Sequence, residues 1–331
     1  MKKNRIILGV DVSKATLDTY NHSTEQFFTV ENIHKGFAEI LAKIVSSNKI
    51  KKDDLLFCFE STGKYSKRLS LFLQSEVIPF VMVPGLEIKR SLGIARGKND
   101  KIDARRIALY AYEKRERLVP TILPNEKIDK ILSSISLRNQ LVKQRTALKN
   151  GMSDLYDSYH EGDSNFYKEV RQRLIDALDQ EITLIEKEIE SVIKSDPSIK
   201  KNFDLMLTIR GVGKIIAYYV IAYTHNFTRI IDPRSFACYT GIAPFGYSSG
   251  TMKGKSRVHP FANKKLKALF TMGAMSAINI KGEYREYYKK RQQMGKNNMS
   301  TLNIIRNKIV HRIFAVVKRG TPYVDLLKFA A

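Results

Sequence analysis

The sequence predicts a mixed α/β sheet domain, then a long antiparallel helical hairpin, then a mostly α-helical C-terminal domain. Three patterns predict this order. Short apolar runs alternate with helix-like segments up to about residue 120, a heptad-like apolar stripe follows, and the rest of the chain has mostly helical spacing. The expected domain boundaries are 1–122, 123–197 and 198–331.

The first domain is expected to be a sheet with helices on its faces. Apolar runs rich in branched and aromatic residues predict strands at 6–10, 16–20, 27–30, 55–59 and 79–83. Helical spacing predicts helices over 37–45 and 65–73. Hairpin strands followed by strand–helix alternation indicate a mixed sheet rather than a purely parallel one.

The second region is predicted to be a helical hairpin. Its later half carries an apolar stripe whose residues are spaced by four and three: Leu178, Ile182, Ile185, Ile189 and Val192. The stretch 128–148 is also helical in pattern, and a turn is expected at 160–165. A hairpin is too thin to be a globular domain, so we expect a coiled-coil connector or dimerisation arm.

Charge is the most informative property of the composition. The 331 residues include 57 Lys or Arg and 33 Asp or Glu, a formal net charge of +24. This excess indicates a polyanionic partner, either nucleic acid or an anionic membrane surface. No apolar run approaches the roughly 18–20 residues of a membrane-spanning helix, and the apolar stretch at 6–10 is too short for a signal peptide. We therefore expect nucleic acid, and no membrane, as the partner.

The two cysteines, Cys58 and Cys238, lie far apart and have no His or Cys neighbour at ligand spacing. This argues against a disulfide framework and against a zinc site. The cysteine usage fits a reducing compartment, so we expect a cytoplasmic protein.

Most of the positive charge lies near the C-terminus. Residues 251–320 contain seventeen Lys or Arg against two Glu. Tyr284, Tyr287 and Tyr288 are interleaved with the lysines and arginines of the segment 281–291, a combination typical of nucleic-acid binding. A solvated helical face is the alternative interpretation of the same segment.

Two acids follow predicted strands directly. Asp11 ends the first apolar run, and Glu60 ends the run at 55–59. Side chains at such strand ends line the crevice where α/β sheets bind ligands. Two carboxylates there can share a divalent cation. The alternatives are that Asp11 is a turn former and that Glu60 is a surface acid.

Asp100 and Asp103 are three residues apart and so share one face of a helix. Together with the strand-end acids they provide four carboxylates, enough to hold two metal ions for phosphodiester transfer. The alternative is that this pair merely caps a helix N-terminus.

These acidic motifs resemble those of the bridge-RNA-guided insertion-sequence transposases of the IS110 type, which include the Piv-like DNA invertases. Gly9–Lys14 is similar to the opening strand of that family's RuvC-like (RNase H-like) domain. Glu60–Tyr65 is similar to its second acidic motif. Lys98–Ala104 resembles its paired-aspartate motif, with Asn99 where threonine is more usual. The metal-binding catalytic acids that the resemblance implies are Asp11, Glu60, Asp100 and Asp103.

A second block of resemblance lies in the C-terminal domain. Leu207–Gly213 followed by Ala217 resembles a helix-hairpin-helix, in which backbone N–H groups at a helix start bind phosphate; an ordinary turn is the alternative. Tyr239–Gly250 resembles the family's catalytic-serine motif. Ser249, immediately before a glycine, is the implied nucleophile, and Ser248 is its adjacent competitor.

The resemblance implies a DNA transposase that cuts and rejoins strands by serine attack on the phosphodiester, with Mg²⁺ or Mn²⁺ as cofactor. Double-stranded donor and target DNA, a structured guide RNA and a homo-oligomer, dimer or tetramer, are the implied partners. A prokaryotic, nucleoid-associated protein is expected. The nucleic-acid-binding residues that we expect are Lys64, Arg105, Gly211, Gly213, Lys214, Lys253, Lys255, Arg257, Lys264, Lys265, Arg285, Lys289, Lys290 and Arg291.

Two other functions fit the same residues. A metal-dependent RuvC-like nuclease or junction resolvase would use the acids with water as nucleophile, and Ser249→Ala would leave its cleavage intact. A non-enzymatic nucleic-acid-binding regulator would use the acids only as caps and surface charges, and Asp11→Asn would change nothing.

Overall fold

The computed structural model describes residues 6–45, 51–91, 99–158, 161–249, 252–258 and 260–325. The chain divides into two compact units, Met1–Leu123 and Pro124–Ala331. The predicted separation of the second unit into a connector of 123–197 and a helical domain of 198–331 stays a prediction.

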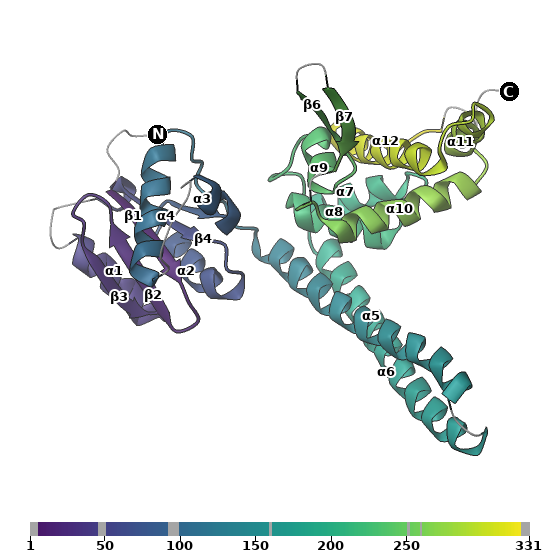
Figure 1. The fold of residues 1–331 in the computed structure, drawn as a ribbon, viewed down its shortest axis with the longest axis horizontal. Coiled ribbons are helices and arrows are strands. Elements are labelled where there is room, and N and C mark those ends of the chain that lie inside the picture. The colour runs from purple at the N-terminus through teal and green to yellow at the C-terminus, as the bar shows by residue number, and fades with distance from the viewer. Residues whose placement is uncertain are drawn as a thin grey trace. The chain divides into compact units, whose positions relative to one another are not determined.

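The first unit contains a five-stranded mixed sheet with helices on both faces (Figure 1). Its strands are β1 (Ile6–Val12), β2 (Thr16–Asn21), β3 (Phe27–Glu31), β4 (Leu55–Glu60) and β5 (Phe80–Val83). Its helices are α1 (His34–Val45), the short 3-10 helix η1 (Lys52–Asp54), α2 (Lys64–Ser75), α3 (Gly85–Ser91) and α4 (Asp100–Lys114). The spatial order is β3-β2-β1-β4-β5. The first three strands pair antiparallel, whereas β4 and β5 run parallel to β1.

Alternation of side chains along the strands assigns the helices to opposite faces. Leu8, Val10 and Phe57 pack in one core with residues of α1 and α2. Ile7 and Cys58 pack in the other core, with residues of α3 and α4. The predicted mixed α/β sheet with helices on its faces is therefore confirmed.

Gly9 explains how closely α4 approaches the sheet. A Cβ atom at Gly9 would lie 2.3 Å from the carbonyl oxygen of Ala104 and 2.3 Å from the amide nitrogen of Ala108. Only a residue without a side chain lets the helix backbone lie against β1 at this distance. The first half of α4 is therefore held over the end of β1 that carries Asp11.

The second unit begins with the two longest helices, α5 (Glu126–Ser158) and α6 (Glu161–Lys194). They pair antiparallel, because residues early in α5 contact residues late in α6. Arg138 Nε lies 2.7 Å from Glu186 Oε1, and Lys127 bonds Asp196 just beyond the end of α6. The predicted helical hairpin is present, and Ile182, Ile189 and Val192 of its apolar stripe are buried.

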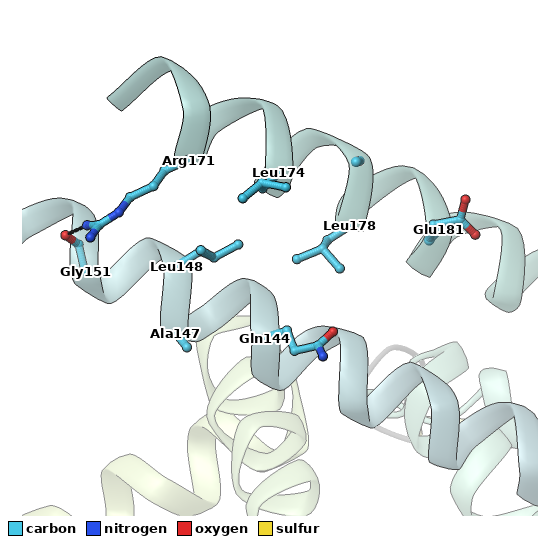
Figure 2. Close-up of a pocket in the computed structure, with 9 residues that line it drawn as sticks. Gln144, Ala147, Leu148, Gly151, Arg171, Leu174, Leu178 and Glu181 are labelled. Atoms are coloured by element: carbon cyan, nitrogen blue, oxygen red, sulfur yellow. Dashed lines mark hydrogen bonds between the residues drawn. The ribbon is translucent and has the colours of Figure 1, made fainter. Parts of the chain in front are cut away.

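The expected turn at 160–165 was wrong in extent, because α6 already begins at Glu161. Residue 160 of that stretch lies outside the described residues. Farther along, an apolar groove lies between the two helices, with Leu148, Leu174 and Leu178 along its walls (Figure 2). Arg171 donates a hydrogen bond from α6 to the backbone carbonyl of Gly151 in α5, which ties the helices together beside the groove.

The rest of the second unit is mostly helical. Its helices are α7 (Pro197–Leu207), α8 (Lys214–Thr224), α9 (Pro233–Tyr239), α10 (Lys264–Asn279), α11 (Glu283–Gln293) and α12 (Asn298–Arg319). One antiparallel strand pair, β6 (Phe245–Ser249) and β7 (Met252–Arg257), interrupts them. The core is built around α8, whose Tyr218, Tyr219 and Ile221 are almost completely buried. Among the helices that the structure describes, none is long and apolar enough to cross a membrane.

Candidate functional site

Asp11 and Glu60 stand at the same end of two adjacent parallel strands. Val10 of β1 is the register partner of Phe59 of β4, and each acid is the next residue along its strand. Asp11 has the parity of Ile7 and Gly9, and Glu60 that of Leu56 and Cys58, so both side chains face α3 and α4. Both residues are half-buried.

Glu60 occupies space that a glycine provides. A Cβ atom at Gly85, the first residue of α3, would lie 1.9 Å from Glu60 Oε1. The carboxylate of Glu60 is therefore packed against the backbone at the start of α3 and is not a freely solvated surface acid. Gly85 could not be singled out from the sequence, because its importance depends on the pairing of β4 with β5.

Asn99 is the N-cap residue of α4. Its side chain accepts hydrogen bonds from the backbone N–H groups of Lys101, at 2.8 Å, and Ile102, at 3.4 Å. The capping role belongs to Asn99, and neither Asp100 nor Asp103 performs it. Asp100 is exposed, whereas the half-buried Asp103 accepts a 3.0 Å hydrogen bond from Arg106.

The four predicted acids act on one another electrostatically. The pKa of Asp11 is raised to about 6, first by burial and then by the negative charges of Asp103, Asp100, Asp18 and Glu60, in that order. This set contains all three of the other acids that the sequence singled out. The first unit therefore has an accumulation of negative charge at the Asp11 end of its sheet.

Asp18 is an acid of this cluster that the sequence analysis missed. It is the register partner of Asp11 across β1 and β2, it is 7% exposed, and Thr29 donates a 2.5 Å hydrogen bond to it. The sequence does contain an indication of this acid, because a tight turn after β1 brings a residue of the next strand opposite Asp11.

A carboxylate whose pKa is raised by neighbouring negative charges, as that of Asp11 is, is suited to a divalent cation, because a cation offsets the repulsion. As the side chains stand, however, no three His, Cys, Asp or Glu residues within the described parts of the chain are grouped closely enough to hold one ion. The donor chemistry and the charge fit a divalent metal, but the structure shows no formed set of ligands.

Ser249 is the last residue of β6, and its backbone pairs with that of Met252 in β7. Ser248 pairs with Lys253 in the same hairpin. Lys255 and Arg257 continue β7, while Gly250 lies outside the described residues. The two serines therefore belong to one strand of this pair.

The glycines of the predicted helix-hairpin-helix have different roles. Gly211 has a φ of +83°, and a Cβ there would lie 2.4 Å from the carbonyl oxygen of Gly273 in α10. It is therefore required for turn geometry and packing. Gly213 is the N-cap of α8, and a Cβ there would meet nothing within 4 Å. The adjacent Lys214 is paired with Glu190 at 2.7 Å.

The basic residues predicted to bind nucleic acid lie mainly on surface helices. Lys264, Lys265, Lys289 and Lys290 are exposed, whereas Arg285 and Arg291 are half-buried. Two of the residues predicted to bind nucleic acid lie in the first unit, and both are exposed: Lys64, at the start of α2, and Arg105, in α4.

The tyrosines interleaved with the basic residues of 281–291 indicate nucleic-acid binding by their sequence pattern, but they pack inside the second unit. Tyr284 is only 2% exposed and belongs to the core, and Tyr287 and Tyr288 pack against that core. Arg312 lies over the Tyr284 ring and Lys308 over the Tyr287 ring. These rings therefore hold α11 on α12, and Tyr284 is not available to stack on a base.

Comparison with known proteins matches both halves of the chain to transposases. Residues 8–161 match a family model described as "Transposase", named for the DEDD acids and IS110. Residues 204–289 match the model "Transposase IS116/IS110/IS902 family".

Two relatives illustrate the similarity. The insertion element IS116 uncharacterized 44.8 kDa protein of Streptomyces clavuligerus is 21% identical, with 96% of each chain covered. The transposase for insertion sequence element IS1111A of Coxiella burnetii is 24% identical, with 56% of each chain covered.

The family models cover both the sheet with its acidic end and part of the helical second unit. The protein is therefore a transposase, an enzyme that recombines DNA. More particularly, the chain belongs to the IS110 family of insertion-sequence transposases.

Proposed function

We propose that this transposase cuts and rejoins DNA through a covalent bond between Ser249 and DNA, with the acids of a RuvC-like first unit acting on the same phosphodiester. The role of the acids in this proposal is supported by the placement of Asp11 and Glu60 at the ends of neighbouring strands. The position of α4 over β1, which brings Asp103 and Asp100 into electrostatic range of Asp11, supports it further.

Asp11, Glu60, Asp100 and Asp103 are the residues that would hold a divalent cation, Mg²⁺ or Mn²⁺. When bound, such an ion supplies Lewis-acid polarisation of the phosphate and charge stabilisation at the attacking and leaving oxygens. Gly85 leaves room for the Glu60 carboxylate, and Asn99 caps α4, so that neither Asp100 nor Asp103 is needed for the cap.

The proposed chemical step forms one bond and breaks one. The Ser249 oxygen attacks phosphorus and loses its proton to a nearby base, while the bond from phosphorus to the 3′ oxygen breaks and that oxygen takes up a proton. The phosphoserine keeps the phosphodiester energy, so a 3′ hydroxyl can later reverse the step and rejoin strands without ATP. Three cations of β7 follow the serine closely in sequence and provide positive charge for the transition state: Lys253, Lys255 and Arg257.

The serine belongs to the second unit and the acids to the first. The proposal therefore requires both units, from one chain or from two copies in a homo-oligomer, to act on the same phosphate. We further propose that a structured guide RNA selects the donor and target DNA, and that the exposed lysines of α10 and α11 contribute to holding nucleic acid.

A denaturing gel tests the covalent step. Purified protein is incubated with Mg²⁺, DNA carrying the element's ends and RNA transcribed from its flanking non-coding segments. We expect a protein–DNA adduct that survives denaturation, and mass spectrometry after nuclease digestion should find the nucleotide on Ser249. Ser249→Ala should abolish the adduct and the cleavage, whereas the neighbouring Ser248→Ala should retain both.

Cleavage without any adduct, or undiminished cleavage by Ser249→Ala, would show that water is the nucleophile. The metal-dependent nuclease would then be the correct description. An adduct on Ser248 would preserve the covalent mechanism but move the nucleophile by one residue.

A further inference from the structure

One side of α4 carries basic and aromatic side chains at helical spacing. Five residues follow one another at intervals of four, three, four and three: Lys101, Arg105, Ala108, Tyr112 and the C-cap residue Arg115. This spacing places them in a single row along the helix. Ala108 is buried against the sheet, whereas Lys101, Arg105 and Tyr112 are exposed.

The row runs beside the β2–β3 hairpin, whose rings face it. Lys101 Nζ lies 5.5 Å from the centroid of the Phe27 ring, and Arg105 Cζ lies 5.9 Å from that of Tyr20. Tyr20 and Phe27 are register partners on the α4 face of the sheet. These rings hold the two cationic side chains near the surface while their charged ends remain accessible.

Tyr112 is the aromatic residue of the row. Its side chain is 41% exposed, its ring centroid lies 4.2 Å from that of His22, and Arg115 Cζ lies 4.2 Å from the same ring. Burial and the charges of Arg115 and Arg105 lower the pKa of His22 more than Glu25 raises it. The imidazole is therefore neutral at pH 7 and presents an uncharged flat ring beside Tyr112.

This aromatic pair is connected to the acidic cluster by two elements. β2 leads from Asp18, opposite Asp11, through Tyr20 to His22, which follows the strand. Helix α4 leads from Asp103 to Tyr112, an axial distance of about 13 Å at the α-helical rise. Figure 1 shows α4 lying along β1 and β2 in this unit. Arg105 lies between Asp103 and Tyr112 along the helix, whereas Lys101 precedes Asp103, next to Asp100.

We propose that this side of α4 binds a single DNA strand, with a base stacked on the Tyr112–His22 pair and phosphates near Lys101, Arg105 and Arg115. An exposed ring with adjacent guanidinium groups is the combination that binds unpaired bases and their backbone. A paired strand hides its base faces, so the surface fits a single strand. We take the strand to be DNA because the enzyme recombines DNA. Only the path of that strand towards the acids rests on the proposed function.

Binding is tested without cleavage. Fluorescence polarisation of a short labelled oligothymidylate is measured with the full chain in EDTA, so that failure of the metal or serine mechanism does not affect the result. Tyr112→Leu should weaken binding about tenfold, the effect of losing one stacked base. Tyr112→Phe should restore wild-type affinity, since stacking needs the ring and not the hydroxyl. Tyr167→Leu, which removes a tyrosine 45% exposed on α6, should have no effect.

A crosslinking measurement covers binding by other basic surfaces. Oligothymidylate carrying 4-thiothymidine should crosslink to the peptide that contains Tyr112, and unlabelled duplex should compete poorly for that crosslink. Equal affinity of Tyr112→Leu and wild type together with no crosslink in α4 would overturn the proposal. A loss by Tyr112→Leu that is confined to duplex DNA or to oligouridylate would overturn it as well.

Discussion

Asp11 in β1 lies directly opposite Asp18 in β2, so two carboxylates face each other across the same pair of strands. Like charges in this arrangement are destabilising unless something compensates them. Asp18 is bonded to Thr29, whereas Asp11 has its pKa raised to about 6 by burial and by four surrounding acids. The fold therefore tolerates an unfavourable charge at Asp11.

Removing that charge should stabilise the metal-free protein. The folded-state pKa of Asp11, about 6, exceeds the ordinary value of 3.8, so its ionisation costs stability as the pH rises through 6. In EDTA, Asp11→Asn should raise the Tm by a few degrees near pH 8, and the gain should shrink towards pH 4, where the wild-type carboxyl is protonated. Thermal unfolding at both pH values measures this. Asp53→Asn, at an exposed acid of the same unit, serves as the control, and an equal gain from it would contradict the assignment.

Gly85→Ala should disable the enzyme without unfolding it. The new Cβ would occupy space within 1.9 Å of Glu60 Oε1, so the carboxylate must move. A displacement of about 1 Å at a catalytic group can cost about 100-fold in rate. Strand-cleavage rates and Tm are compared with those of Gly151→Ala, whose Cβ would meet only the flexible end of Arg171. Full activity in Gly85→Ala would show that Glu60 does not need its present position.

Mixing two inactive variants tests whether the site is built between copies. Asp11→Asn lacks an acid and Ser249→Ala lacks the nucleophile, so neither should cut DNA alone. If the acids of one copy act with the serine of another, the mixture should recover part of the wild-type cleavage. Addition of Asp11→Asn to the double variant Asp11→Asn/Ser249→Ala is the matched control and should recover nothing. An inactive first mixture, with both proteins folded and oligomeric, would place the acids and the serine of one site in the same copy.

The exposed lysines of α11 should contribute electrostatic affinity. Lys289→Gln/Lys290→Gln should weaken DNA binding and lower the magnitude of the salt-dependence slope by about two, since each lost phosphate contact removes about one. Binding titrations over a range of salt concentrations measure the slope. Lys130→Gln, which alters a lysine of α5 that is paired with Glu188 of α6, should leave the slope unchanged. The same slope in all three proteins would remove α11 from the binding surface.

The sequence was sufficient to predict features that depend on local pattern. Short apolar runs located the strands that carry Asp11 and Glu60, and heptad spacing located the α5–α6 hairpin. The position of acids directly after apolar runs was enough to select Glu60, since strand ends converge in any such sheet.

Features that depend on register and long-range packing were not predictable in this way. Asp18 joins the acidic cluster only because β2 pairs with β1 in one particular register. Gly85 matters only because β5 brings α3 against Glu60. Tyr284 looked like a surface ring among basic residues, but α12 covers it, and no helical period in α11 alone reveals that.

Direct titration of Mn²⁺ into the purified protein at neutral pH tests the shared acidic site most directly. The account predicts saturable binding to wild type and a loss of affinity of at least about tenfold in Asp11→Asn, Glu60→Gln and Asp103→Asn alike. Glu76→Gln, at an acid paired with Lys52 away from the cluster, should bind as wild type does. Equal Mn²⁺ affinity in wild type and in all three cluster variants would contradict the claim that these carboxylates share a cation.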